Sequence, residues 1–224
     1  MVEYHQTDIP NDILGASLIS LEITTSGDDP TKDELCTLQI GRYPSPICKL
    51  INIIKLDSKI HKNLAHLLTT SSIRKITFDP IKFNLWFSTQ YELMPNRMLG
   101  LTLLGNLLGY KDTSMNSLVK KYFGVTRQII PDSSIKWLNN FESWDKTQKI
   151  SALDSVKFHL TIFKELEKEL IQNELKQKFT EYSSYINLLV KLKENGLCKK
   201  EILDNLQEND IELDIDLFEE RGQK

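Results

Sequence analysis

The stretch SLISLEITT, residues 17–25, decides the fold. It is apolar and rich in β-branched residues, which is typical of a buried strand. Glu22 is its one carboxylate, and by the two-residue repeat of a strand it shares a face with Ser20. A carboxylate in a buried strand is costly unless a partner stabilises it. Glu22 is therefore part of a metal site, a remnant of one, or a strand-end residue that faces water.

The composition of the chain limits its class and its compartment. It has 224 residues and a net charge of −3, so its overall charge does not indicate nucleic-acid binding. Residues 201–220 hold nine acidic residues and no Lys or Arg, which leaves the remainder mildly basic. Cys36, Cys48 and Cys198 lack the spacing of a zinc site or a disulfide framework and fit a reducing compartment. We expect a cytoplasmic protein, with the nucleus as the alternative.

The order of predicted elements indicates an α/β domain. Strands are predicted over 14–25, 35–41 and 47–54, and their hairpin-length connections indicate an antiparallel meander. A helix ending near residue 68 and a strand over 73–78 follow. The remaining pattern is helical over 80–93, 98–110, 113–124, 146–176, 179–196 and 198–210. A mixed sheet with helices around it is therefore predicted.

Several stretches resemble the RNase D-like branch of the 3′–5′ exonucleases. They are residues 17–25 with LCTLQIG (35–41), KITFDPIKFNLWF (75–87), MLGLTLLGNLLGY (98–110), TSMNSLVKKYFGV (113–125) and ISALDSVKFHLTIFKEL (150–166). The resemblance implies an RNase H-like mixed sheet flanked by helices in residues 1–175. A helical extension with an acidic tail would occupy residues 176–224.

The same resemblance implies a chemistry and a set of site positions. The family uses two divalent cations that are held by carboxylates and activate a water molecule, and a tyrosine helps to position that water. The four acidic positions of the family correspond here to Ser20, Glu22, Asn84 and Asp154, and the tyrosine position corresponds to Ile150. Two carboxylates and the hydroxyl are thus replaced. Asp79 would supply one of the two missing acids only if the sequence were aligned with the family motif in a shifted register.

These replacements lead to the prediction of a catalytically inactive, exonuclease-like adaptor. It would have no catalytic residues, no metal and no other cofactor, similar in its lost acids to the Exuperantia-like exonuclease domains of germline RNA pathways. Its predicted role is in an RNA-processing or RNA-silencing complex. The alternative is a weak 3′–5′ exonuclease of RNA or single-stranded DNA that uses Mg²⁺ or Mn²⁺ at Glu22 and Asp154.

Two surfaces are candidates for partners. The first is the apolar side of the helix predicted over 179–196, which would bind a protein partner or a second copy of the chain through Ile186, Leu189, Val190 and Leu192. The other interpretation is that this helix packs on its own domain. The second surface is basic and would contact an RNA backbone through Lys120, Lys121, Arg127 and Lys136. The alternative for these residues is a solvated helix face.

Overall fold

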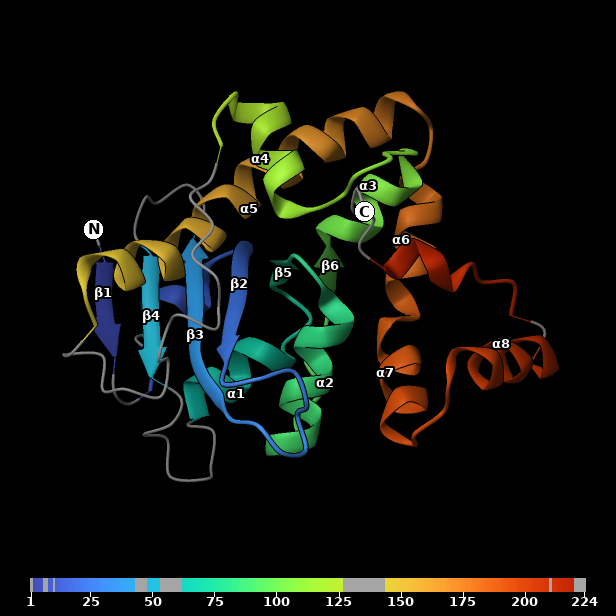
Figure 1. Cartoon of the computed structure of the whole chain (residues 1–224), viewed down its shortest axis with the longest axis horizontal. Coiled ribbons are helices and arrows are strands. Elements are labelled where there is room, and N and C mark those ends of the chain that lie inside the picture. Colours follow the sequence, from blue (N-terminus) through green and yellow to red (C-terminus); the bar gives the residue numbers. More distant parts are fainter. Residues whose placement is uncertain are drawn as a thin grey trace.

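The computed structural model describes residues 2–5, 8–9, 11–42, 48–52, 62–126, 144–209 and 211–219. Within these residues one sheet has six strands in the order β1-β4-β3-β2-β5-β6 (Figure 1). The strands are β1 (Val2–His5), β2 (Leu18–Thr25), β3 (Leu35–Arg42), β4 (Cys48–Asn52), β5 (Arg74–Thr77) and β6 (Met98–Gly100). The meander β2-β3-β4 is antiparallel and the other pairs are parallel, so the predicted mixed sheet is confirmed.

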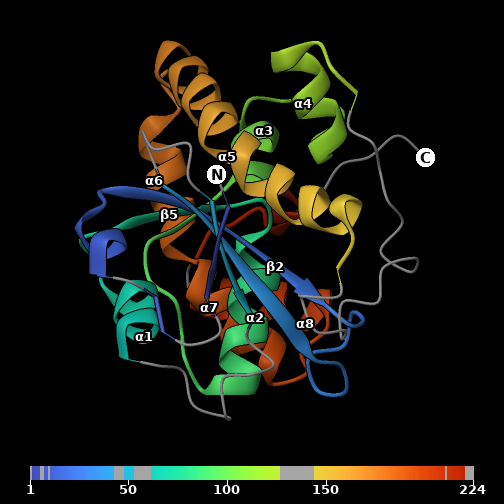
Figure 2. The same ribbon diagram turned by 90° about the vertical axis from the view of Figure 1, so that its left-hand side faces the viewer.

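Helices cover both faces of this sheet (Figure 2). The described helices are α1 (Lys62–Thr69), α2 (Pro80–Tyr91), α3 (Leu101–Leu107), α4 (Met115–Phe123), α5 (Lys146–Gln172), α6 (Lys176–Ser184), α7 (Ile186–Glu194) and α8 (Lys199–Glu208). Helix α5 crosses β2, β3, β4 and β5 on one face, and α1 and α2 lie on the other. None of the described helices is long and apolar enough to span a membrane.

Local sequence signals set the ends of the helices that flank the site. Asp79 caps α2 by accepting two backbone hydrogen bonds from its first turn, and Pro80 occupies the first position, where no donor is needed. Ser114 caps α4 by accepting a hydrogen bond from Ser117 N, and Gly124 ends it at a φ of 65°. Both helices therefore begin where a capping side chain stands in the chain, and α4 also ends at a glycine.

The helical pattern misled the prediction in two places. Residues 98–110 were expected to be helical throughout, but Met98–Gly100 form β6, which pairs with β5 and precedes α3. An apolar run suits a buried strand as well as a buried helix, so periodicity alone does not separate them. The helix predicted over 179–196 is divided at Tyr185 into α6 and α7.

The C-terminal helices pack on the exonuclease-like part. Helix α7 lies against α2, and the 3₁₀ helix η4 (Ile215–Phe218) is bonded to α3 through Asn106, whose Nδ2 donates to Leu217 O at 2.7 Å. The predicted boundary after residue 175 falls between α5 and α6 and stays a prediction.

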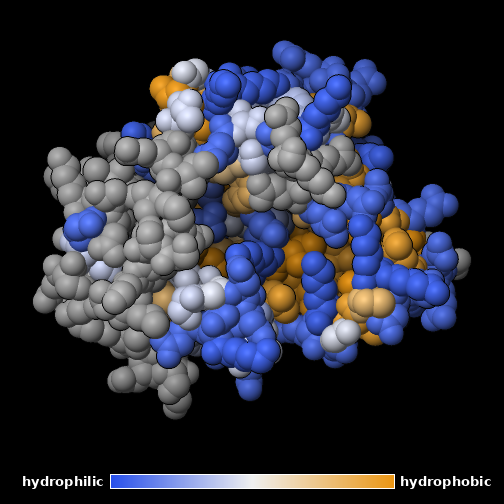
Figure 3. All heavy atoms as spheres, in the orientation of Figure 1, coloured by the Kyte–Doolittle hydropathy of each residue, from blue (hydrophilic) through white to orange (hydrophobic). Residues whose placement is uncertain are grey.

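A cavity of about 540 Å³ lies between α2 and the C-terminal helices. Figure 3 shows apolar residues gathered in this hollow beneath hydrophilic ones. Its charged lining residues are balanced, with three lysines against three acids: Lys82, Lys193 and Lys199, and Asp28, Asp79 and Glu219. The described lining residues of this cavity therefore carry no net charge.

Candidate active site

One face of β2 and β3 is polar beside α5. Ser20 and Glu22 point to this face from β2, and their partners across the β2–β3 register are Gly41 and Gln39. Glu22 is the one acidic residue in the sequences of these two strands. The opposite face is apolar, with Ile19, Leu21, Leu38 and Ile40 in the core. Alternation along the strand therefore separates a candidate site from the core.

Ser20 joins β2 to α5. Its side chain is fully buried, and its Oγ donates to Val156 O at 2.9 Å. The helix approaches closely because Gly41 has no side chain, since a Cβ there would lie 2.4 Å from Ser20 Oγ and 3.2 Å from Val156 O. The hydroxyl is therefore committed to a backbone carbonyl of α5.

Glu22 has a partner that the sequence did not suggest. Its Oε2 lies 3.6 Å from Nε2 of His159, and its Oε1 accepts a hydrogen bond from Ile23 N. The side chain of His159 is 1% exposed and that of Glu22 is 23% exposed, so solvent reaches the carboxylate. The signal for His159 was its place among the buried residues Val156 and Phe163 of α5, where a lone polar residue needs a partner.

Asn84 is directed towards α7. It is fully buried, and its Nδ2 donates to Asn187 Oδ1 at 2.8 Å and to Pro95 O at 3.1 Å. Its Oδ1 is buried, and no described residue donates a hydrogen bond to it. Asn84 therefore ties α2 to α7.

Asp154 and Ile150 both lie in α5. Asp154 is half-buried, and at about 100° per residue it points some 140° away from His159, the residue of α5 that contacts Glu22. The side chain of Ile150 lies outside the described part of the structure. The helix therefore does not present Asp154 and His159 on the same side.

Asp79 serves as a helix cap and not as a substitute ligand. Its Oδ1 accepts hydrogen bonds from the backbone N–H groups of Ile81 and Lys82, both at 2.9 Å. Burial raises the pKa of Asp79, and these two bonds and the charge of Lys193 oppose the rise. The shifted register that would use Asp79 as a ligand thus finds this carboxylate already occupied.

These donors can be tested against the needs of a two-metal site. Among the residues that the structure describes, no three His, Cys, Asp or Glu side chains are grouped to hold a metal ion. Ser20 and Asn84 would supply neutral groups that already bond to the protein. Mg²⁺ prefers carboxylate and water oxygens. The described residues do not fit a site in which four carboxylates hold two ions.

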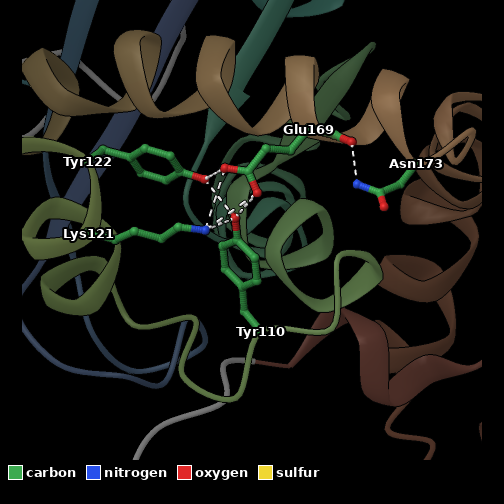
Figure 4. A network of polar contacts seen from close by, with 5 residues as sticks. All are labelled: Tyr110, Lys121, Tyr122, Glu169 and Asn173. Carbon is green, nitrogen blue, oxygen red and sulfur yellow. Dashed lines mark hydrogen bonds and ion pairs between the residues drawn. The ribbon is translucent and has the colours of Figure 1, made fainter.

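Two of the four predicted RNA contacts lie in the described part of the structure. Lys120 and Lys121 are exposed in the last turn of α4, whereas Arg127 and Lys136 lie outside the described residues. Lys121 contacts Tyr110, Tyr122 and Glu169 (Figure 4), with its Nζ 3.4 Å from Glu169 Oε2. Its charge is therefore partly compensated within the protein.

The predicted partner surface is buried in this structure. Ile186, Leu189, Val190 and Leu192 of α7 are all at most 8% exposed and belong to the core. This matches the other interpretation of the segment, a helix that packs back on its own domain. A protein partner or a second copy stays a prediction without an assigned surface.

Comparisons with known proteins place the chain in a family and identify its fold. A sequence model of the 3′–5′ exonuclease family matches residues 5–171. No curated protein sequence matches significantly. Among solved structures, NrnC of Brucella melitensis with bound Mg²⁺ is 19% identical with a TM-score of 0.78, over 88% of this chain and 94% of that one. RNase D of Escherichia coli, an exoribonuclease, is 17% identical with a TM-score of 0.72, over 85% and 51% of the chains.

A third similar structure is the catalytic core of RRP6 from Trypanosoma brucei, 14% identical with a TM-score of 0.69, over 83% of this chain and 52% of that one. The predicted RNase H-like fold with a helical C-terminal region is confirmed by these likenesses. The Exuperantia-like degenerate status is not shown by any of them.

Two sequence predictions are corrected by these matches. The prediction that the chain is not an enzyme is wrong, because a family of exonucleases matches three quarters of it and its fold is that of nucleases. The prediction of no cofactor is also contradicted, because the family fold is seen with Mg²⁺ in NrnC. Both errors arose because the replacement of two acidic residues was interpreted as a loss of catalytic activity. By the match over residues 5–171, this chain belongs to the 3′–5′ exonuclease family.

Proposed function

We propose that the chain is a 3′–5′ exonuclease that acts on RNA or single-stranded DNA and depends on a divalent metal ion. Its family membership supports the reaction, and the Mg²⁺ of the NrnC structure supports the metal. The observation that carries the proposal is Glu22, a solvent-accessible carboxylate on the polar face of β2 beside His159.

The residues of the site have distinct tasks in this proposal. Hydrolysis at a 3′ end needs a group that accepts a proton from the attacking water. Glu22 is accessible enough to contact that water, and the buried His159 holds its carboxylate in place. A bound divalent ion would polarise the phosphate and stabilise the charge that develops on it. The described residues do not define its ligands, so no step is assigned to it.

The choice of substrates to test follows from the ligands bound in the similar structures. One NrnC structure has pGG bound, and an RNase D of Trypanosoma brucei was solved with the RNA U12. We propose single-stranded oligonucleotides between these two lengths as substrates, with RNA as the partner class. The cytoplasm stays the proposed compartment, because Cys36 and Cys198 are free thiols.

The test is cleavage of 5′-labelled RNA and DNA oligonucleotides in Mg²⁺, in Mn²⁺ and in EDTA. We expect laddering from the 3′ end with either metal and none in EDTA. Glu22→Gln should lower the rate by about 100-fold, as loss of a proton-transfer group does. Glu165→Gln is the matched control, because the side chain of Glu165 on α5 is 40% exposed and pairs only with Lys168 among the described residues.

Two results would overturn the proposal. An absence of laddering in all metal conditions would show that the chain does not cleave these substrates. Equal laddering by the wild type and Glu22→Gln would show that the activity does not use this site.

A further inference from the structure

A second cavity, of about 480 Å³, lies where β5, the middle of α5 and the α6–α7 pair meet. The lining residues that matter here are Arg74, Arg97, Phe163, Glu167, Lys176 and Ser183. Arg74 pairs with Leu18 in the β2–β5 register, so it lies on the same face of the sheet as Ser20 and Glu22. The cavity therefore opens beside α5, as Glu22 does.

The charges of this cavity are not balanced. Glu167 is the one acidic residue among the described lining residues, and its Oε1 lies 3.3 Å from Nη1 of Arg74. The Arg74 guanidinium also lies over the ring of Phe163, 6.0 Å from its centroid. Arg97 and Lys176 have no acidic partner among the described residues. Two positive charges thus remain for an anionic ligand.

The wall that carries Arg97 is held rigidly. Arg97 has a φ of 54°, which is uncommon for residues other than Gly, Asn and Asp, and its Nη1 donates to Ser71 O at 2.9 Å. Behind it, the fully buried Lys75 donates from Nζ to three carbonyls, among them Asn96 O at 2.9 Å. Strain of this kind persists where the surrounding structure enforces it, often at ligand-binding sites.

The opposite wall offers an unused donor. Ser183 Oγ, on α6, is buried and has no hydrogen-bond partner in the described part of the chain. A buried hydroxyl without an acceptor costs free energy that a ligand oxygen would recover. Phosphate groups match the two cations of this cavity that lack an acidic partner among the described residues.

We propose that this cavity binds the phosphate backbone of a single-stranded RNA or DNA substrate, upstream of the 3′ end held at Glu22. This inference rests on the proposed exonuclease function. Leu18 and Glu22 are four residues apart on β2, about 13 Å along the strand, and α5 covers the buried Ser20 between them, so a bound strand would pass around this helix. A dinucleotide at Glu22 would not reach it, whereas a longer strand would.

The test is binding of 5′-fluorescein-labelled U12 RNA and of a labelled dinucleotide, measured by fluorescence anisotropy in EDTA at several salt concentrations. The variant is Lys176→Gln and the matched control is Lys178→Gln, because both lysines are exposed on α6 and only Lys176 lines the cavity. Lys176→Gln should weaken U12 binding about fivefold and lower the salt dependence by about 0.7 in log–log slope. Arg97→Asn, which tolerates the positive φ, should act in the same direction.

The outcomes separate this inference from the proposed function. The inference requires that Lys176→Gln leaves the affinity for the dinucleotide unchanged and that Lys178→Gln binds U12 as the wild type does. Equal weakening by both lysine variants, or displacement of U12 by uridine monophosphate at equal concentration, would overturn it. If all variants cleave RNA and bind U12 with equal affinity, the cavity inference is overturned and the exonuclease proposal is kept. Selective loss of U12 binding in a protein that does not cleave would support the cavity and overturn the exonuclease.

Discussion

The hydroxyl of Ser20 is a packing contact between β2 and α5, at a position with no access to solvent. Ser20→Ala removes one donor, and we expect a loss of about 1 kcal/mol in the free energy of unfolding. Ser20→Asp, which introduces the acid of the family, places a carboxylate against Val156 O in a space limited by Gly41. It should cost about 3 kcal/mol or more, because an unpaired buried charge is added.

Urea unfolding of the two Ser20 variants measures this difference. The Asp variant should unfold at a lower urea concentration than the Ala variant. If both unfold with the wild type, the close packing of α5 on β2 is wrong. The same experiment shows why adding an acid at this position does not by itself build a metal site.

The two described thiols should differ in reactivity. Cys36 is fully buried, and its burial raises the pKa of the thiol to about 12, whereas Cys198 is exposed at the start of α8. The thiolate is the form that reacts with alkylating reagents. Iodoacetamide at about pH 8, followed by peptide mass mapping, should label Cys198 in the native protein. Cys36 should be labelled only after denaturation, and its labelling at the rate of Cys198 would contradict its burial.

At the scale of elements, Glu169 joins α4, α5 and the segment after α3. Tyr122 Oη donates to its Oε1 at 2.8 Å, Tyr110 Oη donates to its Oε2, and Lys121 completes the cluster (Figure 4). Desolvation raises the pKa of Glu169, but the two phenols and the lysine outweigh it and hold this pKa below its ordinary value of 4.5. Burial and the same hydrogen bonds raise the pKa of Tyr122. The cluster is thus most stable with Glu169 charged and Tyr122 neutral.

A pKa that is lower in the folded state stabilises the protein above the pKa of the unfolded state. The contribution of Glu169 should therefore be complete at neutral pH and disappear as the pH falls below about 4.5. Thermal unfolding of the wild type and Glu169→Gln between acid and neutral pH measures it. The difference in Tm should shrink towards acid. A difference that stays constant with pH would assign the effect to packing and not to charge.

The sequence predicted those elements whose signals are local. The meander followed from alternating strands and turns, and α2 (Pro80–Tyr91) and α4 (Met115–Phe123) lie within the predicted helical ranges 80–93 and 113–124. The direction in which the Asp154 side chain points could not be predicted from the sequence, because it depends on how α5 is rotated against β2. That rotation is set by the close approach at Gly41. The Glu22–His159 contact joins residues 137 positions apart and was missed for the same reason.

At the scale of the whole molecule, the C-terminal helices complete the exonuclease-like core. The amide of Asn84 bonds α2 to α7, and Asn106 bonds α3 to the segment around η4. The proposed backbone-binding cavity also takes one wall from β5 and α5 and the other from α6 and α7. The position of α6 and α7 therefore determines how α2, which carries Asn84, is held, and it also determines the proposed path of the substrate.

We expect the chain to unfold as one cooperative unit, and Asn106 tests this. Its buried Nδ2 donates to Leu217 O at 2.7 Å and to Glu219 O at 2.8 Å, so Asn106→Ala should cost about 2 kcal/mol. Asn209→Ala is the control, because its exposed amide makes one bond, to Asn205 O. Far-UV circular dichroism and tryptophan fluorescence should report one shared transition, shifted by Asn106→Ala alone. Two separate transitions would mean that the C-terminal helices fold independently of the exonuclease-like core, so that α6 and α7 could leave the core without unfolding it.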